Sequence, residues 1–166
     1  MKVDVSGIRN VNGAQISLNG ECQFDPVTFF GEEYRFEQPV QLVGVLINIG
    51  TKLELTAKVK GSVSAKCARC GKPLRCPFQY ELREVLTSES AAADMQDDDI
   101  IVFEGNEINV DEIALNNFIM NAPMRYLCKE DCKGLCQKCG KDLNEGSCSC
   151  KKDEIDPRLA ILDKLF

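Results

Sequence analysis

The chain has 166 residues, of which 44% are hydrophobic and 28% are charged, which is ordinary for one soluble globular domain with a small satellite module. Its net charge of −6 argues against a protein that coats nucleic acid, and the absence of histidine excludes Ser-His-Asp and Cys-His catalysis, HExxH sites and histidine-containing zinc fingers. We find no secretory leader and no apolar run of about 18 residues, so we expect a cytoplasmic protein without a membrane span.

Residues 1–87 are predicted to form a β-rich domain with a central CxxC. Apolar residues alternate in 40–66 and in 77–86, a pattern typical of antiparallel strands with one buried face. We interpret Gly50 and Gly61 as turn or bulge positions. Because sequential strands usually pair, we expect an antiparallel meander of four to six strands or a partly open barrel.

Residues 88–99 are acidic and small, and we expect them to form a mobile loop. Residues 100–127 are predicted to complete the domain with a short hairpin, IIVF and EINV around EGN, followed by a helix that Asp111 caps and Pro123 ends. The apolar face of this helix is expected to carry Leu115, Phe118, Ile119 and Ala122.

Residues 153–166 are predicted to form a C-terminal helix capped by Asp156, with Pro157 at its first position. Before it, residues 128–152 hold six of the ten cysteines. In a reducing cytoplasm, clustered thiols indicate metal or redox chemistry more than disulfides. We therefore predict an α+β protein: a β-meander or partly open barrel with one or two packed helices and a small C-terminal all-cysteine zinc module.

A short pattern, CxxCGKxL, occurs twice, as CARCGKPL (67–74) and as CQKCGKDL (136–143). In a zinc knuckle of this kind, the glycine permits an unusual backbone dihedral, which allows amide N–H groups to point at the thiolate sulfurs. The repeated pattern is the strongest chemical signal in the sequence.

The simplest metal site pairs a CxxC with a downstream CxC, and four thiolates without histidine favour structural zinc. Its ligands would be Cys136, Cys139, Cys148 and Cys150. The spacing leaves two alternatives for Cys128 and Cys132: they replace one of those ligands, or they join Cys67 and Cys70 in a second all-thiolate site. An iron–sulfur cluster is the chemical alternative to zinc.

The chain resembles the YceD family, the large ribosomal RNA subunit accumulation proteins. The resemblance spans nearly the full length and rests on KVDVSGI, CARCGKPL, LCKEDCKGLCQKCGKDLN, CSC and IDPRLAILDKL. It implies a bacterial or plastid-type protein needed for normal accumulation of large-subunit ribosomal RNA. By similarity, the family's central pair falls on Cys67 and Cys70. Its C-terminal run falls on Cys128, Cys132, Cys136 and Cys139, and its closing motif falls on Asp156, Pro157 and Arg158.

We therefore expect a non-catalytic, zinc-stabilised factor that binds large-subunit ribosomal RNA or an assembly protein bound to it, with no small-molecule substrate. Charge is uneven along the chain, with a net +6 in residues 52–76 and a net −10 in residues 81–112. The candidate contacts to RNA or to a partner are six basic side chains: Lys58, Lys60, Lys66, Arg69, Lys72 and Arg75.

The alternative function is a protein–protein adaptor. Its acidic segment, residues 89–112, would dock a basic ribosomal protein or a ribonuclease without direct RNA binding. The lysines also have a purely structural interpretation. Alternating lysines on a strand are commonly the solvated face of a half-buried sheet, with no binding role. No pattern in the sequence indicates an oligomeric state.

Overall fold

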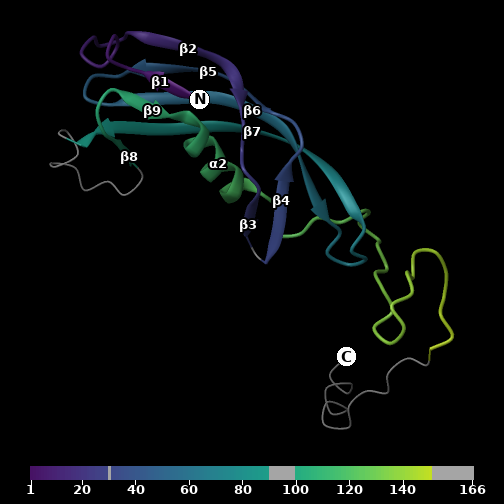
Figure 1. The fold of residues 1–166 in the computed structure, drawn as a ribbon. Coiled ribbons are helices and arrows are strands. Elements are labelled where there is room, and N and C mark those ends of the chain that lie inside the picture. The colour runs from purple at the N-terminus through teal and green to yellow at the C-terminus, as the bar shows by residue number, and fades with distance from the viewer. Residues whose placement is uncertain (30, 90–99, 151–166) are drawn as a thin grey trace, which may run out of the picture.

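The computed structural model describes residues 1–29, 31–89 and 100–150, which form a curved sheet, a second small sheet and one helix (Figure 1). The elements are β1 (Lys2–Asp4), β2 (Gln15–Cys22), β3 (Val27–Phe29), β4 (Glu32–Phe36), β5 (Val40–Asn48), β6 (Leu53–Lys66), β7 (Pro73–Ser88), β8 (Ile100–Phe103), β9 (Glu107–Asn109) and α2 (Val110–Asn121). No helix in these described ranges is long and apolar enough to cross a membrane.

Strand β6 is the centre of a seven-stranded sheet. One edge of β6 pairs with β7 along its whole length, from Leu53 opposite Leu86 to Lys66 opposite Pro73. Its other edge is shared, because β5 pairs with residues 53–60 and β4 pairs with residues 63–64. Strands β2 and β3 extend the sheet from β5 and β4, and β8 joins β7 in parallel.

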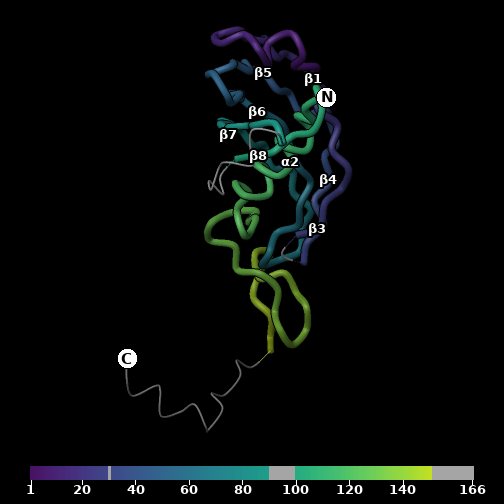
Figure 2. The backbone as a smooth tube through the Cα atoms, turned by 90° about the vertical axis from the view of Figure 1, so that its left-hand side faces the viewer, coloured from purple at the N-terminus to yellow at the C-terminus, as the bar shows by residue number. Residues whose placement is uncertain are grey.

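The predicted meander is confirmed for β5, β6 and β7, which are consecutive and antiparallel. The predicted barrel is not formed: the sheet stays open, since no pairing among the described residues joins its outer strands. Its concave side is filled by α2 instead. Figure 2 shows α2 lying between β6 and β7 on one side and β3 and β4 on the other.

The predicted hairpin of residues 100–110 is wrong. Its first strand, β8, pairs with β7, and its second strand, β9, pairs with β1. Two strands of only 4 and 3 residues would make a marginal hairpin by themselves, whereas β7 offers β8 the edge of a 16-residue strand.

Helix α2 ends at Asn121, as the position of Pro123 predicts, but its beginning differs from the prediction. The residue before the helix is Asn109, whose side chain makes no capping hydrogen bond. Asp111 lies inside the first turn and accepts a hydrogen bond from the amino group of Met1. The Asp111 carboxylate, which the sequence predicts to cap the helix, therefore pairs with the amino group of Met1 instead.

The core is built from the alternating inward residues of the strands and from one face of α2. On the helix, Phe118 is buried as predicted, but Ile113 and Ala114 are also buried, while Leu115, Ile119 and Ala122 are only half-buried. The buried face of the helix is thus turned toward Ile113. Residues 90–99 of the predicted acidic loop and the predicted C-terminal helix with Asp156 lie outside the described residues.

Gly61 lies inside β6, where the pairing with β5 has ended and the pairing with β4 has not yet begun. It is neither a turn nor a bulge against β7, because the register there is continuous, with Gly61 opposite Phe78. A Cβ atom at this position would lie 2.8 Å from the Phe78 ring and 3.0 Å from a methyl group of Val40. A side chain at this position would therefore require the Phe78 ring or Val40 to shift. Gly50, in contrast, occupies the turn between β5 and β6 with a φ of 109°.

We predict that Phe118→Ala lowers the free energy of unfolding by about 3–5 kcal/mol, because the ring fills the centre of an aromatic cluster. Its ring centroid lies 4.7 Å from that of Phe78 and 5.0 Å from that of Phe36. Urea denaturation followed by circular dichroism measures the change. Met120→Ala, on the exposed side of the same helix, is the control and should change the free energy by less than about 0.5 kcal/mol. Equal effects of the two substitutions would contradict this account of the core.

Candidate metal centre

The first CxxC knuckle is the turn of the long β6–β7 hairpin, residues 67–72. The N–H of Cys67 donates to the carbonyl of Lys72 at 2.8 Å, and the N–H of Gly71 donates back to the carbonyl of Cys67 at 2.8 Å. Gly71 has a φ of 69°, in the left-handed region that favours glycine. The turn thus closes on itself and presents both thiols at the end of the sheet.

The second knuckle repeats this backbone structure. The N–H of Cys136 donates to the carbonyl of Lys141 at 2.8 Å, and the N–H of Gly140 donates to the carbonyl of Cys136 at 2.8 Å. Gly140 has a φ of 71°. The sequence repeat therefore corresponds to a structural repeat, and the conformational role predicted for its glycine is present in both copies.

A first set of four thiols gathers at the hairpin turn. We call it the first quartet: Cys67, Cys70, Cys128 and Cys132. All four sulfurs lie within 4.8 Å of one another. The sulfurs of Cys67 and Cys132 are 3.8 Å apart, and those of Cys70 and Cys128 are 3.7 Å apart.

These separations fit a tetrahedral metal ion. Metal–sulfur bonds of about 2.3 Å in tetrahedral geometry place the sulfurs about 3.8 Å apart, whereas a disulfide needs about 2.05 Å. All four thiols are free in the structure, and three of them are buried. The donor set and spacing of the first quartet are therefore compatible with a four-coordinate metal ion.

Contacts from the knuckle hold the returning chain in place after α2. The guanidinium of Arg69 donates to the carbonyls of Glu130 and Cys132, at 3.1 and 2.7 Å, and the N–H of Ala68 donates to the carbonyl of Tyr126 at 2.9 Å. Gly134 passes so close that a Cβ atom would lie 2.9 Å from the carbonyl oxygen of Arg69. The ligand pair from residues 128–132 is thus fixed against the hairpin turn.

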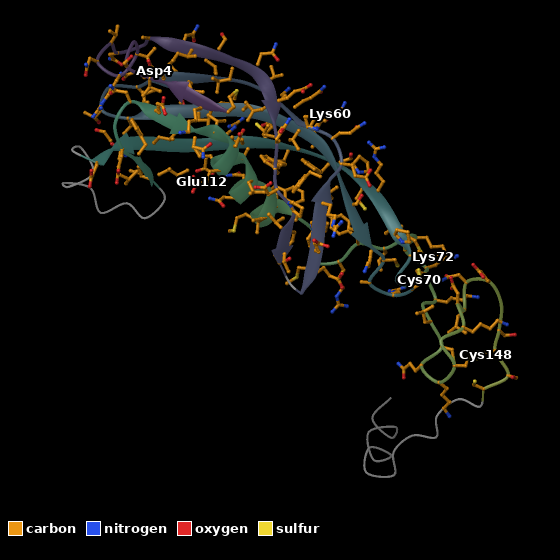
Figure 3. All side chains as sticks on the ribbon, in the orientation of Figure 1. Asp4, Lys60, Cys70, Lys72, Glu112 and Cys148 are labelled. Atoms are coloured by element: carbon orange, nitrogen blue, oxygen red, sulfur yellow. The ribbon has the colours of Figure 1, made fainter. Side chains whose placement is uncertain are left out.

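A second set of four thiols lies farther from the sheet. We call it the second quartet: Cys136, Cys139, Cys148 and Cys150. Its sulfurs also lie within 4.8 Å of one another, and its members are half-buried or exposed. Figure 3 shows the separation of the two sites, with Cys70 at the end of the sheet and Cys148 in the outer part of the cysteine-rich segment.

Backbone amides favour the thiolate form in both knuckles. Burial opposes ionisation of Cys67, but the N–H groups of Cys128, Cys70 and Arg69 outweigh burial and lower its pKa to about 6. The N–H groups of Cys139 and Lys138 lower the pKa of Cys136 to about 6. Thiolates are the form that binds metal, so each knuckle contains one sulfur prepared to be a ligand.

Of the two alternatives for Cys128 and Cys132, the structure has the one in which they join Cys67 and Cys70. Metal binding by either quartet stays a prediction. Of the remaining cysteines, Cys22 is buried in the core and Cys76 is half-buried. Asn144, to which no sequence pattern assigns a role, donates its side-chain N–H to the sulfur of Cys132 at 3.4 Å.

The six basic candidates fall into two groups. Lys58, Lys60 and Lys66 are exposed on β6, on the face opposite the core. Arg69, Lys72 and Arg75 contact the chain itself. Arg69 holds the carbonyls described above, Lys72 forms ion pairs of 2.9 Å with Asp142 and Glu145, and Arg75 donates to Gln38 at 2.7 Å.

Comparison with known proteins places these features in a family. The family model described as "Large ribosomal RNA subunit accumulation protein YceD" matches residues 55–166. The chain is 26% identical to "Uncharacterized protein YlbN" of Bacillus subtilis, over 100% of this chain and 96% of that protein. It is also 26% identical to "Uncharacterized protein Rv2926c" of Mycobacterium tuberculosis, over 100% of this chain and 81% of that protein. No solved structure matches the chain.

We predict that protein purified without added metal contains about two zinc ions per chain, one for each quartet. Cys136→Ser should remove one ion and unfold the outer part of the module while the sheet stays folded, because ligand binding and folding are one event in such small sites. Elemental analysis and thermal melting measure the two effects.

Cys76→Ser is the matched control, since Cys76 belongs to neither quartet, and it should keep both ions. Full metal content and an unchanged melt in Cys136→Ser would show that the second quartet is not a metal site. Iron in place of zinc would contradict the choice of metal.

Proposed function

The chain belongs to the YceD family of large ribosomal RNA subunit accumulation proteins, and from this premise we propose that it is a non-catalytic, zinc-stabilised factor in the accumulation or maturation of that RNA. It acts by binding the ribosomal RNA or a protein bound to it. The observation that carries the proposal is a row of three lysines on the outer face of β6, which leads to the first quartet.

The lysine row consists of Lys58, Lys60 and Lys66. None of the three has an ion-pair partner among the described residues, and Glu81, which lies opposite Lys58, pairs with Arg83 instead. Figure 3 shows Lys60 on the side of the sheet away from α2. Cations without internal partners are suited to phosphate groups, because binding RNA releases counterions without breaking ion pairs within the protein.

Zinc has an architectural role in this proposal. All four ligands of each site come from the chain, so no coordination position is left for a substrate. The ion would hold residues 128–132 against the hairpin turn and fold the outer knuckle. In this way it fixes the end of the sheet that the lysine row approaches.

A second candidate function, an adaptor for a basic protein, is favoured by a groove between β8 and the start of α2. Buried apolar side chains of Leu86, Ile108 and Ile113 form its floor, and three carboxylates line it: Glu104, Glu107 and Glu112. β8 has only β7 as a strand partner among the described residues, so its other edge can accept an extended segment. Acidic walls and a strand edge that pairs with no other described strand suit a basic segment of a ribosomal protein or a ribonuclease.

For the RNA-binding function, we predict that the logarithm of the affinity for a large-subunit ribosomal RNA fragment falls linearly with the logarithm of salt concentration. The triple variant Lys58→Gln, Lys60→Gln, Lys66→Gln should reduce the slope by about 0.7–0.9 for each phosphate group that the variant no longer binds. Filter binding over a salt series measures the slope.

The control variant removes the same total charge away from the lysine row, with Lys2→Gln, Arg35→Gln and Lys129→Gln. It should change the salt dependence of the affinity less than the lysine-row variant does. If both triple variants keep the slope of the unmodified chain, the lysine row does not bind RNA.

For the adaptor function, we predict that a basic ribosomal protein or ribonuclease co-purifies with the chain after nuclease treatment. Reversing the groove with Glu104→Lys, Glu107→Lys and Glu112→Lys should abolish this, because like charges would then face each other. Mass spectrometry of the captured proteins measures the result. The matched control is Glu32→Lys, Glu33→Lys and Glu37→Lys, on and just beyond β4, which should retain the partner. Loss of all captured protein on nuclease treatment would count against the adaptor function.

A further inference from the structure

The two quartets share a structural element. Residues 140–147 connect Cys139 with Cys148, so they form the loop that closes the second quartet. We call them the closing loop. The same loop packs against the first quartet and its knuckle through hydrogen bonds and an ion pair.

Asn144 of the closing loop contacts the first quartet directly. Its side-chain N–H donates to the sulfur of Cys132 at 3.4 Å, and its side-chain oxygen accepts from the N–H of Lys133 at 2.9 Å. The N–H of Leu143 donates to the carbonyl of Gly134 at 2.9 Å. The amide of Asn144 thus lies in the position of an outer-shell donor to a ligand of the other site.

Asp142 holds this amide in place. Its Oδ1 accepts from the backbone N–H of Asn144 at 2.8 Å and from the side-chain N–H at 2.7 Å. Its Oδ2 lies 2.9 Å from Nζ of Lys72, a residue of the first knuckle. The Asp142 side chain is 12% exposed, so solvent screens this ion pair less than the outer Lys72–Glu145 pair, in which Glu145 is 68% exposed.

We propose that metal binding at the two quartets is thermodynamically linked through the closing loop, so that each site binds its ion more tightly when the other is filled. The proposal rests on the metal sites of the proposed function and adds their regulation. Closure of the second quartet fixes both ends of the closing loop, which holds Asn144 against Cys132 and Asp142 against Lys72. Linkage is reciprocal, so the first quartet favours closure of the second by the same factor.

The expected size of the linkage follows from the role of Asn144. Loss of an outer-shell partner typically costs about 10–100-fold in metal affinity. An open closing loop withdraws the Asn144 donor and the Lys72 ion pair together. We therefore expect the two-ion binding constant to exceed the product of the two single-site constants by about 10–100-fold.

Chelator competition with Zn²⁺ on the full chain tests this. The unmodified chain gives the two-ion constant, Cys148→Ser with Cys150→Ser gives the first site alone, and Cys67→Ser with Cys70→Ser gives the second site alone. Circular dichroism checks that each variant keeps the sheet. A two-ion constant at least about 10-fold above the product supports the linkage, and a constant equal to the product overturns it.

Asn144→Ala separates linkage from a general loss of structure. In the unmodified background, it should lower the two-ion constant by about 10-fold or more. In Cys148→Ser with Cys150→Ser, where the closing loop is already released, it should leave the Zn²⁺ affinity of the first site unchanged. Lys72→Met should behave in the same way, with Lys2→Met, on β1, as its control. An equal loss in both backgrounds overturns the proposal. A chain that binds no Zn²⁺ at all overturns the metal sites themselves, which is a different result from two independent sites.

Discussion

The pairing of β6 with β7 is the constraint on which the rest of the structure depends. Its register, from Leu53 opposite Leu86 to Lys66 opposite Pro73, sets which side chains face α2 and which face outward. The same register brings the chain into its turn with two thiols side by side. A slip of one residue would turn the inward side chains of the slipped strand outward and separate the knuckle from its partners. The pairing of β6 with β7 therefore contributes to the core, to the outer lysine row and to the first quartet.

The same short pattern forms both knuckles, one at the end of the sheet and one farther from it. The first is the turn between β6 and β7 and has both of its thiols buried, while the second lies in a segment with little other regular structure. The backbone hydrogen bonds are nearly the same in the two knuckles. The part of the chain that surrounds each knuckle therefore decides what it can stabilise. In the proposed function, a metal ion in the first quartet would attach the module to the sheet, and one in the second quartet would fold the outer part of the module.

The sequence was sufficient for features that depend on local spacing. Alternation predicts β6 and its outward lysines, and the CxxC and CxC spacings select the four cysteines that the structure gathers in the second quartet. The first quartet could only be an alternative, because Cys67 and Cys132 are 65 residues apart and spacing alone does not bring them together. The edge that a short strand joins is equally non-local, which is why the prediction of a hairpin over residues 100–110 is wrong. Strand β2 was missed although Ile16, Leu18 and Cys22 occupy its inward positions.

Gly61 connects the shape of the sheet with the placement of charge. Lys58 and Lys60 precede it, beside β5, whereas Lys66 follows it, beyond the residues that pair with β4. The absence of a side chain at this position lets the Phe78 ring and Val40 close over the junction. Gly61 thus lies between the two halves of the row. A bulkier residue there, whose Cβ would meet Phe78 and Val40, would shift the strand and alter the distance between the positive charges while leaving their number the same.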